Sequence, residues 1–568
     1  MKWERWHGFA AAGVLLLGGA YALGRCDRDR AADTADAGAP ADVTAQAPAD
    51  LLAELYVASP NTTWTKLQRG IGGALGILPA TMPGMVVAVS DLDAQLSSEL
   101  DGTAPIYGAL AGDPADPAWA LAMKLVDGRR ARGILVDGDT SRFTGKDAPG
   151  MTILVPKRVA SAGEKTHEVA ITTNGWLLVA RKPEDLASLG AWVTRGLTAR
   201  PPPAGTAAAI VDVPRAALAT SLAPKLKALW ARAKGYLAGA DERMRAERGR
   251  APDFGDPAAI VAAIDGLVTQ RIDVVGDLEK ARIAIDVTDD AASIEATLTP
   301  LKEGAAQAWV ARMKTGDATP ALSLPASSAV ALSMRDDEDT RAAQGKSLSG
   351  AIAAALGDRL KDRAPIDAMV DAATKARTES FALALAWDEP SGLFLTAPIR
   401  DQASANRAFG GLVDLAKVDP FKEMLRVESV RSGSEEVPGA GKATVATFAR
   451  AAKPDAGAKP RDSGVAWVAD DKTLTAALGP EPLVTLKLAA KSDKRLADEP
   501  TLSRFVSAIG EGASTVLVAQ PLRFDPKKAH LPAAPVAVAV GKRGTDAFVR
   551  IDVPDPLLRE LVRMQMGF

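Results

Sequence analysis

The segment from Gly8 to Gly24 (GFAAAGVLLLGGAYALG) places the strongest constraint on this chain, because its seventeen residues carry no charge. Lys2 and Arg5 precede it, and the charged run Arg25 to Arg30 follows it. An uncharged stretch of this length can enter a bilayer, although it is short for a spanning helix. The residues expected to contact the membrane are Gly8, Phe9, Val14, Leu15, Leu16, Leu17, Tyr21 and Leu23. We therefore expect the rest of the chain to be exported.

Three interpretations of this N-terminal segment stay open. An uncleaved anchor would hold the protein in the inner membrane of a bacterial cell envelope, with its bulk in the periplasm or extracytoplasmic space. A signal peptide would be cleaved at the small-x-small site Ala20-Tyr21-Ala22 and leave a periplasmic protein. A lipoprotein would carry a lipid on Cys26, although Arg25 stands where a lipobox has a small residue. In all three cases the chain leaves the cytoplasm.

Composition limits the classes of function. The 568 residues have a net charge of -2, which argues against nucleic acid as a main partner because phosphate binding needs a basic excess. Cys26 is the only cysteine, so the globular part contains no disulfide. The three histidines (His7, His167 and His530) are far apart in sequence, so a zinc or iron site is not expected. We expect no cofactor.

The order of apolar runs and turns predicts an α+β fold with mostly antiparallel sheets. Strand-like runs such as Gly175 to Ala180 alternate with helical stretches such as Ala403 to Leu415, and several strands follow each other across short polar turns. The expected organisation is a signal or anchor segment, a flexible linker, a first module with a helical insertion at about 215–250, a second linker and a second, related module. Their expected ranges are 1–26, 27–50, 51–315, 316–325 and 326–568.

Four pairs of segments predict that the second module repeats the first. The pairs begin at Pro117 and Glu379, Gly175 and Gly464, Ala208 and Thr515, and Ala281 and Ala547, in the same order in both halves. The alternative explanation is that unrelated strands are built from the same residue types, Ala, Val and Leu. If the repeat is real, the spacing between the last two pairs gives the first half about 41 more residues, the length of a helical hairpin.

The inserted stretch from Pro214 to Arg248 is the candidate interaction element. Apolar side chains from Leu218 to Leu237 recur at helical spacing, and basic residues flank them, with Pro224 expected to interrupt the helix. The candidate binding residues are Lys225, Lys227, Trp230, Arg232 and Lys234. The alternative is a helix packed on a sheet with its basic side in solvent.

Motifs for catalysis are incomplete. Gly345-Lys346-Ser347 resembles the end of a phosphate-binding loop, but Thr340 stands where the first glycine belongs, and acidic residues from Asp336 to Asp339 would repel phosphate. We interpret this stretch as a helix start after an exposed acidic loop. The glycines between Gly70 and Gly76 miss the dinucleotide spacing.

We therefore expect an exported, membrane-tethered envelope protein that acts by binding or scaffolding and is not an enzyme. Its expected partners are the membrane, through the N-terminal segment, and an envelope protein or lipid that the sequence does not identify. Two alternatives stay open: a carrier or chaperone for an apolar ligand such as lipid, and a hydrolase with a site built from carboxylates.

Overall fold

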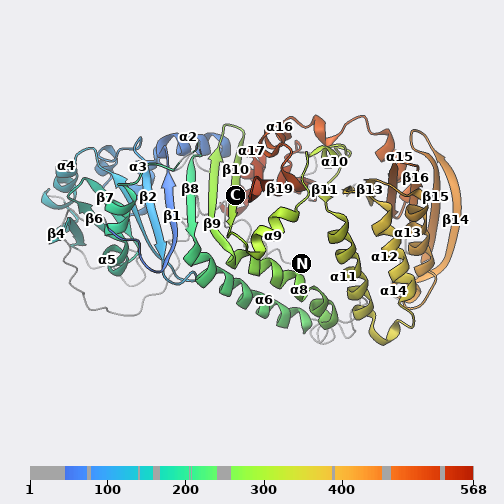
Figure 1. Cartoon of the computed structure of the whole chain (residues 1–568). Coiled ribbons are helices and arrows are strands. Elements are labelled where there is room, and N and C mark those ends of the chain that lie inside the picture. Colours follow the sequence, from blue (N-terminus) through green and yellow to red (C-terminus); the bar gives the residue numbers. More distant parts are fainter. Residues whose placement is uncertain are drawn as a thin grey trace, which may run out of the picture. The chain divides into compact units, whose positions relative to one another are not determined.

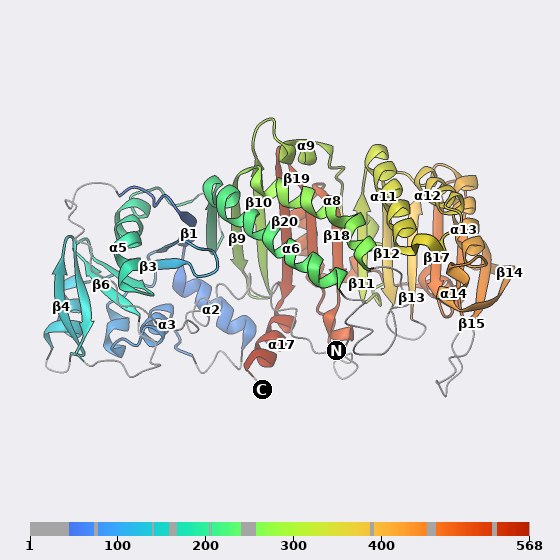
Figure 2. The same cartoon turned by 90° about the horizontal axis from the view of Figure 1, so that it is seen from below.

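A computed structural model describes residues 45–72, 78–138, 141–157, 167–203, 205, 207–239, 257–386, 391–450, 462–524 and 531–566. The chain forms two compact units, and neither is continuous in sequence. Unit 1 comprises Met1–Leu222, Glu279–Leu298 and Asp555–Phe568, and unit 2 comprises Ala223–Leu278 and Thr299–Pro554. The protein is α+β, with large antiparallel sheet structure and packed helices (Figures 1 and 2).

Several strands of unit 1 are buried at consecutive positions, as expected where a sheet has helices on both faces. They are β1 (Leu51–Val57), β2 (Ile106–Ala111), β3 (Ala118–Lys124), β4 (Phe143–Ala148), β5 (Met151–Pro156), β6 (Glu168–Thr172), β7 (Trp176–Ala180), β8 (Ala209–Pro214), β9 (Leu278–Val287) and β10 (Ala291–Pro300). Neighbours pair in the order β4-β5-β6-β7-β3-β2-β1-β8-β9-β10, and each pair from β4 to β9 is antiparallel.

Helices cover both faces of this sheet. They are α2 (Pro60–Ile71), α3 (Met82–Val89), η2 (Ala94–Ser98), α4 (Gly128–Arg132), η3 (Gly133–Asp137), α5 (Pro183–Ala191), η4 (Trp192–Leu197), η5 (Ala217–Leu222) and α17 (Asp555–Met566). On one face Val87 of α3, Leu96 of η2 and Leu135 of η3 pack against the strands. On the other face Leu189 of α5 and Trp192 of η4 pack against alanine-rich positions of β2 and β3.

Unit 2 contains strands β11 (Val330–Arg335), β12 (Ser380–Ala386), β13 (Gly392–Pro398), β14 (Val427–Val437), β15 (Gly441–Arg450), β16 (Ser463–Ala469), β17 (Thr473–Gly479), β18 (Ala513–Ala519), β19 (Val536–Arg543) and β20 (Asp546–Pro554). All neighbouring pairs are antiparallel, in the order β14-β15-β16-β17-β13-β12-β11-β18-β19-β20. Among the described strands, this order is the order of unit 1 with each strand number raised by ten.

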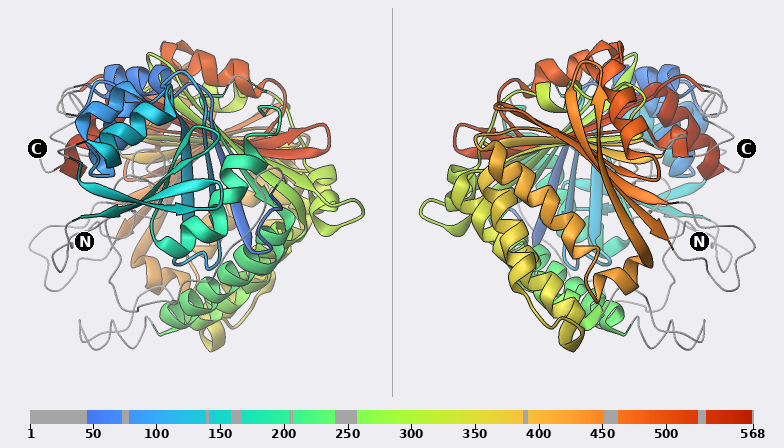
Figure 3. Two further views of the ribbon diagram at one scale, coloured as in Figure 1. Left: turned by 90° about the vertical axis from the view of Figure 1, so that its left-hand side faces the viewer. Right: turned by 90° about the vertical axis from the view of Figure 1, so that its right-hand side faces the viewer.

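The helices of unit 2 also lie on both sheet faces. They are α6 (Ala223–Ala238), α8 (Pro257–Gly276), α9 (Ala305–Arg312), α10 (Thr319–Leu322), α11 (Glu338–Leu356), η6 (Gly357–Arg359), α12 (Ala364–Ala376), α13 (Gln402–Leu415), α14 (Phe421–Leu425), α15 (Pro482–Lys491), η7 (Leu496–Asp498), η8 (Pro500–Leu502), α16 (Ser503–Ile509) and η9 (Pro521–Phe524). α12 and α13 lie side by side (Figure 3), and Ala405 and Val413 of α13 pack on one face. Leu486 of α15 and Phe505 of α16 pack on the other.

Three of the four expected segment pairs do not lie on equivalent strands. Only the pair from Ala208 and Thr515 lies on strands that hold the same place in the two orders, β8 and β18. The other three pairs, which begin at Pro117, Gly175 and Ala281, match β3 with β12, β7 with β16 and β9 with β20, each displaced by one strand. The matches were wrong because neighbouring buried strands use the same small apolar residues, so a one-strand displacement keeps the pattern.

Two segments expected to be linkers contain ordered structure. In the range 316–325, α10 and its flanks bury Ala318, Ala321 and Leu324 in the core of unit 2. Pro320 lies in the first turn of α10, where a missing N–H costs no helix hydrogen bond, so a proline-containing stretch forms a short helix here. In the range 27–50, Ala45 packs against the core of unit 1, and residues 27–44 lie outside the described part.

Candidate interaction surface

The helix α6 contains all five residues expected to bind a partner, and it begins where the sequence predicted an interruption. The π-helical turn η5 ends at Leu222, immediately before Ala223 and Pro224. A proline ring clashes with the carbonyl four residues earlier in a regular α-helix, and a wider π turn relieves that clash. The chain therefore stays helical through Pro224.

Three of the five expected binding residues point at the neighbouring helix. The Trp230 Nε1–H donates to Asp265 Oδ1 at 2.7 Å, and Lys234 Nζ donates to Asp265 Oδ2 at 2.9 Å. Lys227 Nζ lies 2.7 Å from Asp273 Oδ1. The Lys234 hydrogen bond, followed by that of Trp230, lowers the pKa of the Asp265 carboxyl. These polar contacts hold α6 beside α8, and the two helices lie next to each other in Figures 2 and 3.

The apolar stripe of α6 faces solvent. Positions 227, 230 and 234 share one side of the helix, so Leu226, Leu229, Tyr236 and Leu237 fall on an adjacent side. These four side chains are 38, 51, 48 and 41% exposed. We call them the α6 stripe. The alternative interpretation, a helix packed on a sheet by its apolar side, does not hold for these four residues.

The remaining two expected binding residues border the α6 stripe. Lys225 and Arg232 are two helical turns apart, on the edge of the stripe away from Trp230; Arg232 is exposed and Lys225 half-buried. Sequence reasoning missed that Lys227 and Lys234 would be bound by acidic residues of α8. The two lysines are seven residues apart, and Asp265 and Asp273 are eight residues apart, so each pair lies on one side of its helix. This spacing is the sequence signal for a contact between the two helices.

The N-terminal segment with its eight expected membrane residues, from Gly8 to Leu23, lies outside the described residues. Within the described part of the chain, the helices are too short or too polar to span a bilayer. The location of the membrane segment thus stays a prediction from the sequence.

Gly345-Lys346-Ser347 lies inside α11 and not in a loop. The helix begins at Glu338, within the acidic stretch that was expected to be a loop, because the Asp337 side chain accepts a hydrogen bond from the Thr340 N–H and caps it. A phosphate-binding loop needs free backbone amides at the start of a helix, and mid-helix amides are already bonded. This placement agrees with the interpretation of the motif as structural.

The acidic stretch before α11 is partly buried and forms a charge cluster. Asp336 is 6% exposed, and its carboxylate contacts Arg341 at 2.7 Å and also Arg377. Arg341 Nη1 donates to the carbonyl of Thr378 at 2.9 Å. Asp336 was expected in an exposed loop, and the two arginines explain why it is buried, since a paired carboxylate can leave water. The cluster fixes the start of α11 against the chain entering β12.

Of the three histidines, only His167 lies in the described part of the chain. His167 packs beside Trp119, with 5.8 Å between ring centroids, and burial lowers the pKa of its imidazole. His7 and His530 lie outside the described residues. Across the described ranges, no group of three or more His, Cys, Asp or Glu side chains has the geometry of a metal site.

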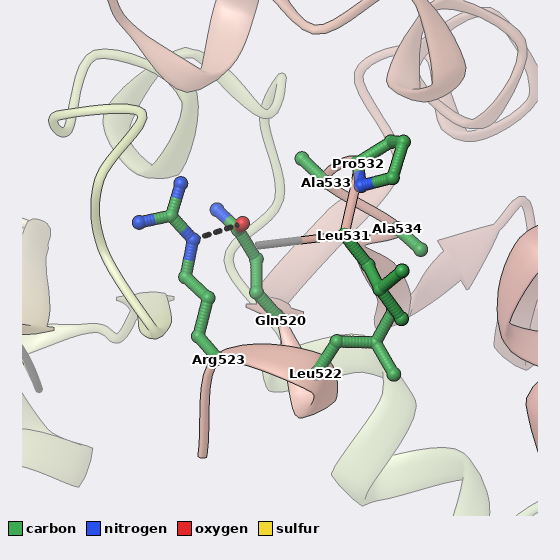
Figure 4. A pocket seen from close by; sticks show the side chains of 7 residues that line it. All are labelled: Gln520, Leu522, Arg523, Leu531, Pro532, Ala533 and Ala534. Atoms are coloured by element: carbon green, nitrogen blue, oxygen red, sulfur yellow. Dashed lines mark hydrogen bonds between the residues drawn. The ribbon is translucent and has the colours of Figure 1, made fainter. Parts of the chain in front are cut away.

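The described part of each unit contains a small pocket. The pocket in unit 2 has a volume of about 30 Å³ and is bordered by Gln520 and Arg523 (Figure 4). Gln520 already donates to the carbonyls of Ala326 and Ser328 and accepts from Arg523 Nε at 2.6 Å. The pocket in unit 1, beside Asn174, has a volume of about 90 Å³. Each has room for a few water molecules, not for a lipid chain.

Comparisons with known proteins leave the family open. No protein-family model matches the chain, and no curated protein does. Solved structures titled as crystal forms I, III and IV of TP0453 align with TM-scores of 0.19, 0.18 and 0.18 and sequence identities of 10, 12 and 13%. They cover 43, 43 and 45% of this chain and 96, 97 and 98% of their own.

Proposed function

We propose that this chain is an exported, membrane-tethered envelope protein that acts by binding or scaffolding and not by catalysis. The observation that carries the proposal is the α6 stripe, which presents four large apolar side chains to solvent on one side of an exposed helix. Contiguous apolar side chains on a protein surface, especially beside polar residues, often mark an interaction site. The uncharged segment Gly8 to Gly24 supports the membrane location.

The polar contacts between α6 and α8 support an interaction role for the exposed apolar side of α6. If α6 lay on the protein by its apolar side, Lys227, Trp230 and Lys234 would lose their partners on α8. These three contacts fix the rotation of the helix and so keep the stripe outward. Because these polar contacts hold the apolar side of α6 in solvent, the helix forgoes the free energy that burying those side chains in the protein would give.

We also propose that the two related modules arose by internal duplication. Ten strands pair in the same order in each unit, within the residues described. The helices also lie on corresponding sheet faces in the two units. In each unit the helices that follow the first and third strands pack on one face, and the helix that follows the seventh strand packs on the other. The pair α6 and α8, between β8 and β9, is the element that the second module lacks in its described part.

A charge-insertion experiment tests the binding role. The variant Leu229→Glu with Leu237→Glu places two carboxylates in the α6 stripe, and it should abolish complementation of a deletion strain at normal protein abundance. The matched control Ala228→Glu with Ala231→Glu places the same charges on exposed positions of the same helix, outside the stripe. Complementation by the stripe variant would contradict the proposal.

A further inference from the structure

We infer that the α6 stripe binds an anionic membrane surface, with α6 lying parallel to the bilayer plane. This inference rests on the proposed membrane location and names the surface that the helix contacts. An interfacial helix places its apolar side chains about 5–10 Å into the boundary between headgroups and acyl chains, with basic side chains at its edges. The stripe, with the exposed Arg232 at its edge, has this arrangement.

The charge of the helix fits anionic headgroups. Ala223–Ala238 contains four basic residues and no acidic residue, in a chain whose net charge is -2. α8 adds Asp265, Asp273 and Arg271, so the helix pair as a whole keeps an excess of three positive charges. Arg232 lies exposed at the edge of the stripe, where a guanidinium can reach a lipid phosphate. A basic surface next to an anionic leaflet gains about 1 kcal/mol per charge.

The side chains of the stripe suit a lipid boundary. Tyr236 combines an apolar ring with a polar hydroxyl, and such rings prefer the headgroup level of a bilayer. The leucines of the stripe supply apolar contacts, and Ala233, which lies between them on the helix, is a small apolar residue. The helix is 16 residues, or about 24 Å, long, so the whole ridge can meet one flat surface.

A folded protein partner fits this surface less well. A helix face about 24 Å long and about 10 Å wide is well below the ~800 Å² that each partner contributes to a standard protein interface. A membrane needs no complementary pocket and covers the same side chains. The affinity of one short amphipathic face is low, so a second membrane signal is required. The proposed N-terminal segment supplies it by raising the local concentration of α6 at the bilayer.

The test uses the full chain with an environment-sensitive fluorescent amino acid at position 229, and in a matched protein at position 231. Both positions are exposed on α6, and only 229 belongs to the stripe. The proteins are mixed with phosphatidylcholine vesicles, with or without phosphatidylglycerol. We expect a blue shift and an intensity gain at 229 on the anionic vesicles, and neither change at 231. Arg232→Gln should lower the ratio of buried to exposed label about fivefold.

Flotation of the same samples separates this inference from the proposed tethering. A label at 229 that stays in water on anionic vesicles, in protein that floats with them, overturns the inference and leaves the tethering intact. Protein that does not float contradicts the tethering. Equal shifts at 229 and 231, or on neutral vesicles alone, also overturn the inference. So does photo-crosslinking of position 229 in cells to a protein while the vesicle signal is absent, since the occupant is then a protein.

Discussion

Asp555 is a buried carboxyl in the contact between α17 and α2. It begins α17, is 5% exposed, and its carboxylate Oδ2 has no hydrogen-bond partner among the described residues. Its backbone N–H donates to the carbonyl of Asp290 at 2.9 Å. The charged groups that face it are Arg559 of α17 and, on the turn before β10, Asp289 and Asp290; from α2, Gly70 presents only its backbone. Burial raises the pKa of Asp555 to about 6, with Arg559 opposing and the two aspartates adding to the rise.

Asp555→Asn should therefore stabilise the protein near pH 8 and lose this advantage in acid. Because the folded-state pKa lies above the ordinary 3.8, the stability that depends on protonated Asp555 is fully present below 3.8 and is lost as pH rises through about 6. With solvent screening, we expect a gain of about 1 kcal/mol at pH 8 and almost none at pH 4. Urea unfolding at both pH values measures it, with the exposed Asp493→Asn as control. A pH-independent difference would contradict the assignment.

At the scale of an element, Gly512, immediately before β18, approaches Gly541 of β19 too closely for a side chain at position 541. A Cβ on Gly541 would lie 2.0 Å from the carbonyl oxygen of Gly512, and that oxygen accepts a hydrogen bond from the Lys542 N–H at 2.9 Å. Gly541→Ala should cost about 3 kcal/mol, because backbone cannot move without breaking the pairing. Gly433→Ala on β14, with no heavy atom within 4 Å, should change the free energy of unfolding by less than about 0.5 kcal/mol.

Denaturant midpoints of the two glycine variants provide the comparison. Equal midpoints would show that the contact at Gly512 relaxes, and a larger loss at Gly433 would mean that β14 makes contacts not seen here. Far-ultraviolet circular dichroism serves as the control for folding of each variant.

The sequence predicted many elements but not their partners. The expected helix Ala403 to Leu415 and strand Gly175 to Ala180 match α13 and β7 to within one residue, because caps and apolar runs are local signals. The start of α11 was missed because its middle carries no apolar period and its cap at Asp337 lies in an acidic run. The outward side of α6 was missed because it depends on Asp265 and Asp273, which are thirty or more residues away. Three of the four segment pairs were assigned to the wrong strands, because a pattern of small apolar residues does not specify which strand pairs with which neighbour.

At the scale of the whole molecule, the sequence halves and the compact units are not the same. The segment Ala223–Leu278 belongs to unit 2 although it follows β8, and Asp555–Phe568 belongs to unit 1 although it follows β20. In unit 1, Leu558 of α17 packs near Trp64 of α2, and Arg559 Nε donates to the carbonyl of Gly70 at 2.5 Å. Each unit therefore needs residues from both halves of the chain, so neither half by itself contains a complete unit.

The last prediction concerns the N-terminus: deletion of residues 1–26 should leave a folded protein that no longer floats with membranes. The first strand, β1, pairs with β2 on one side and β8 on the other, and the Gly112 N–H donates to the carbonyl of Asp50 at 3.0 Å, so β1 has both of its neighbours among the described residues. Residues 27–44 separate the deletion from this sheet, and their Ala-, Asp- and Pro-rich composition is typical of a tether. Flotation and circular dichroism measure the two outcomes, and Leu16→Arg in the full chain is the control that keeps the length but places a charge in the apolar segment. An unfolded truncation would show that the segment belongs to the core, whereas a folded truncation that still floats would assign membrane binding to another part of the chain.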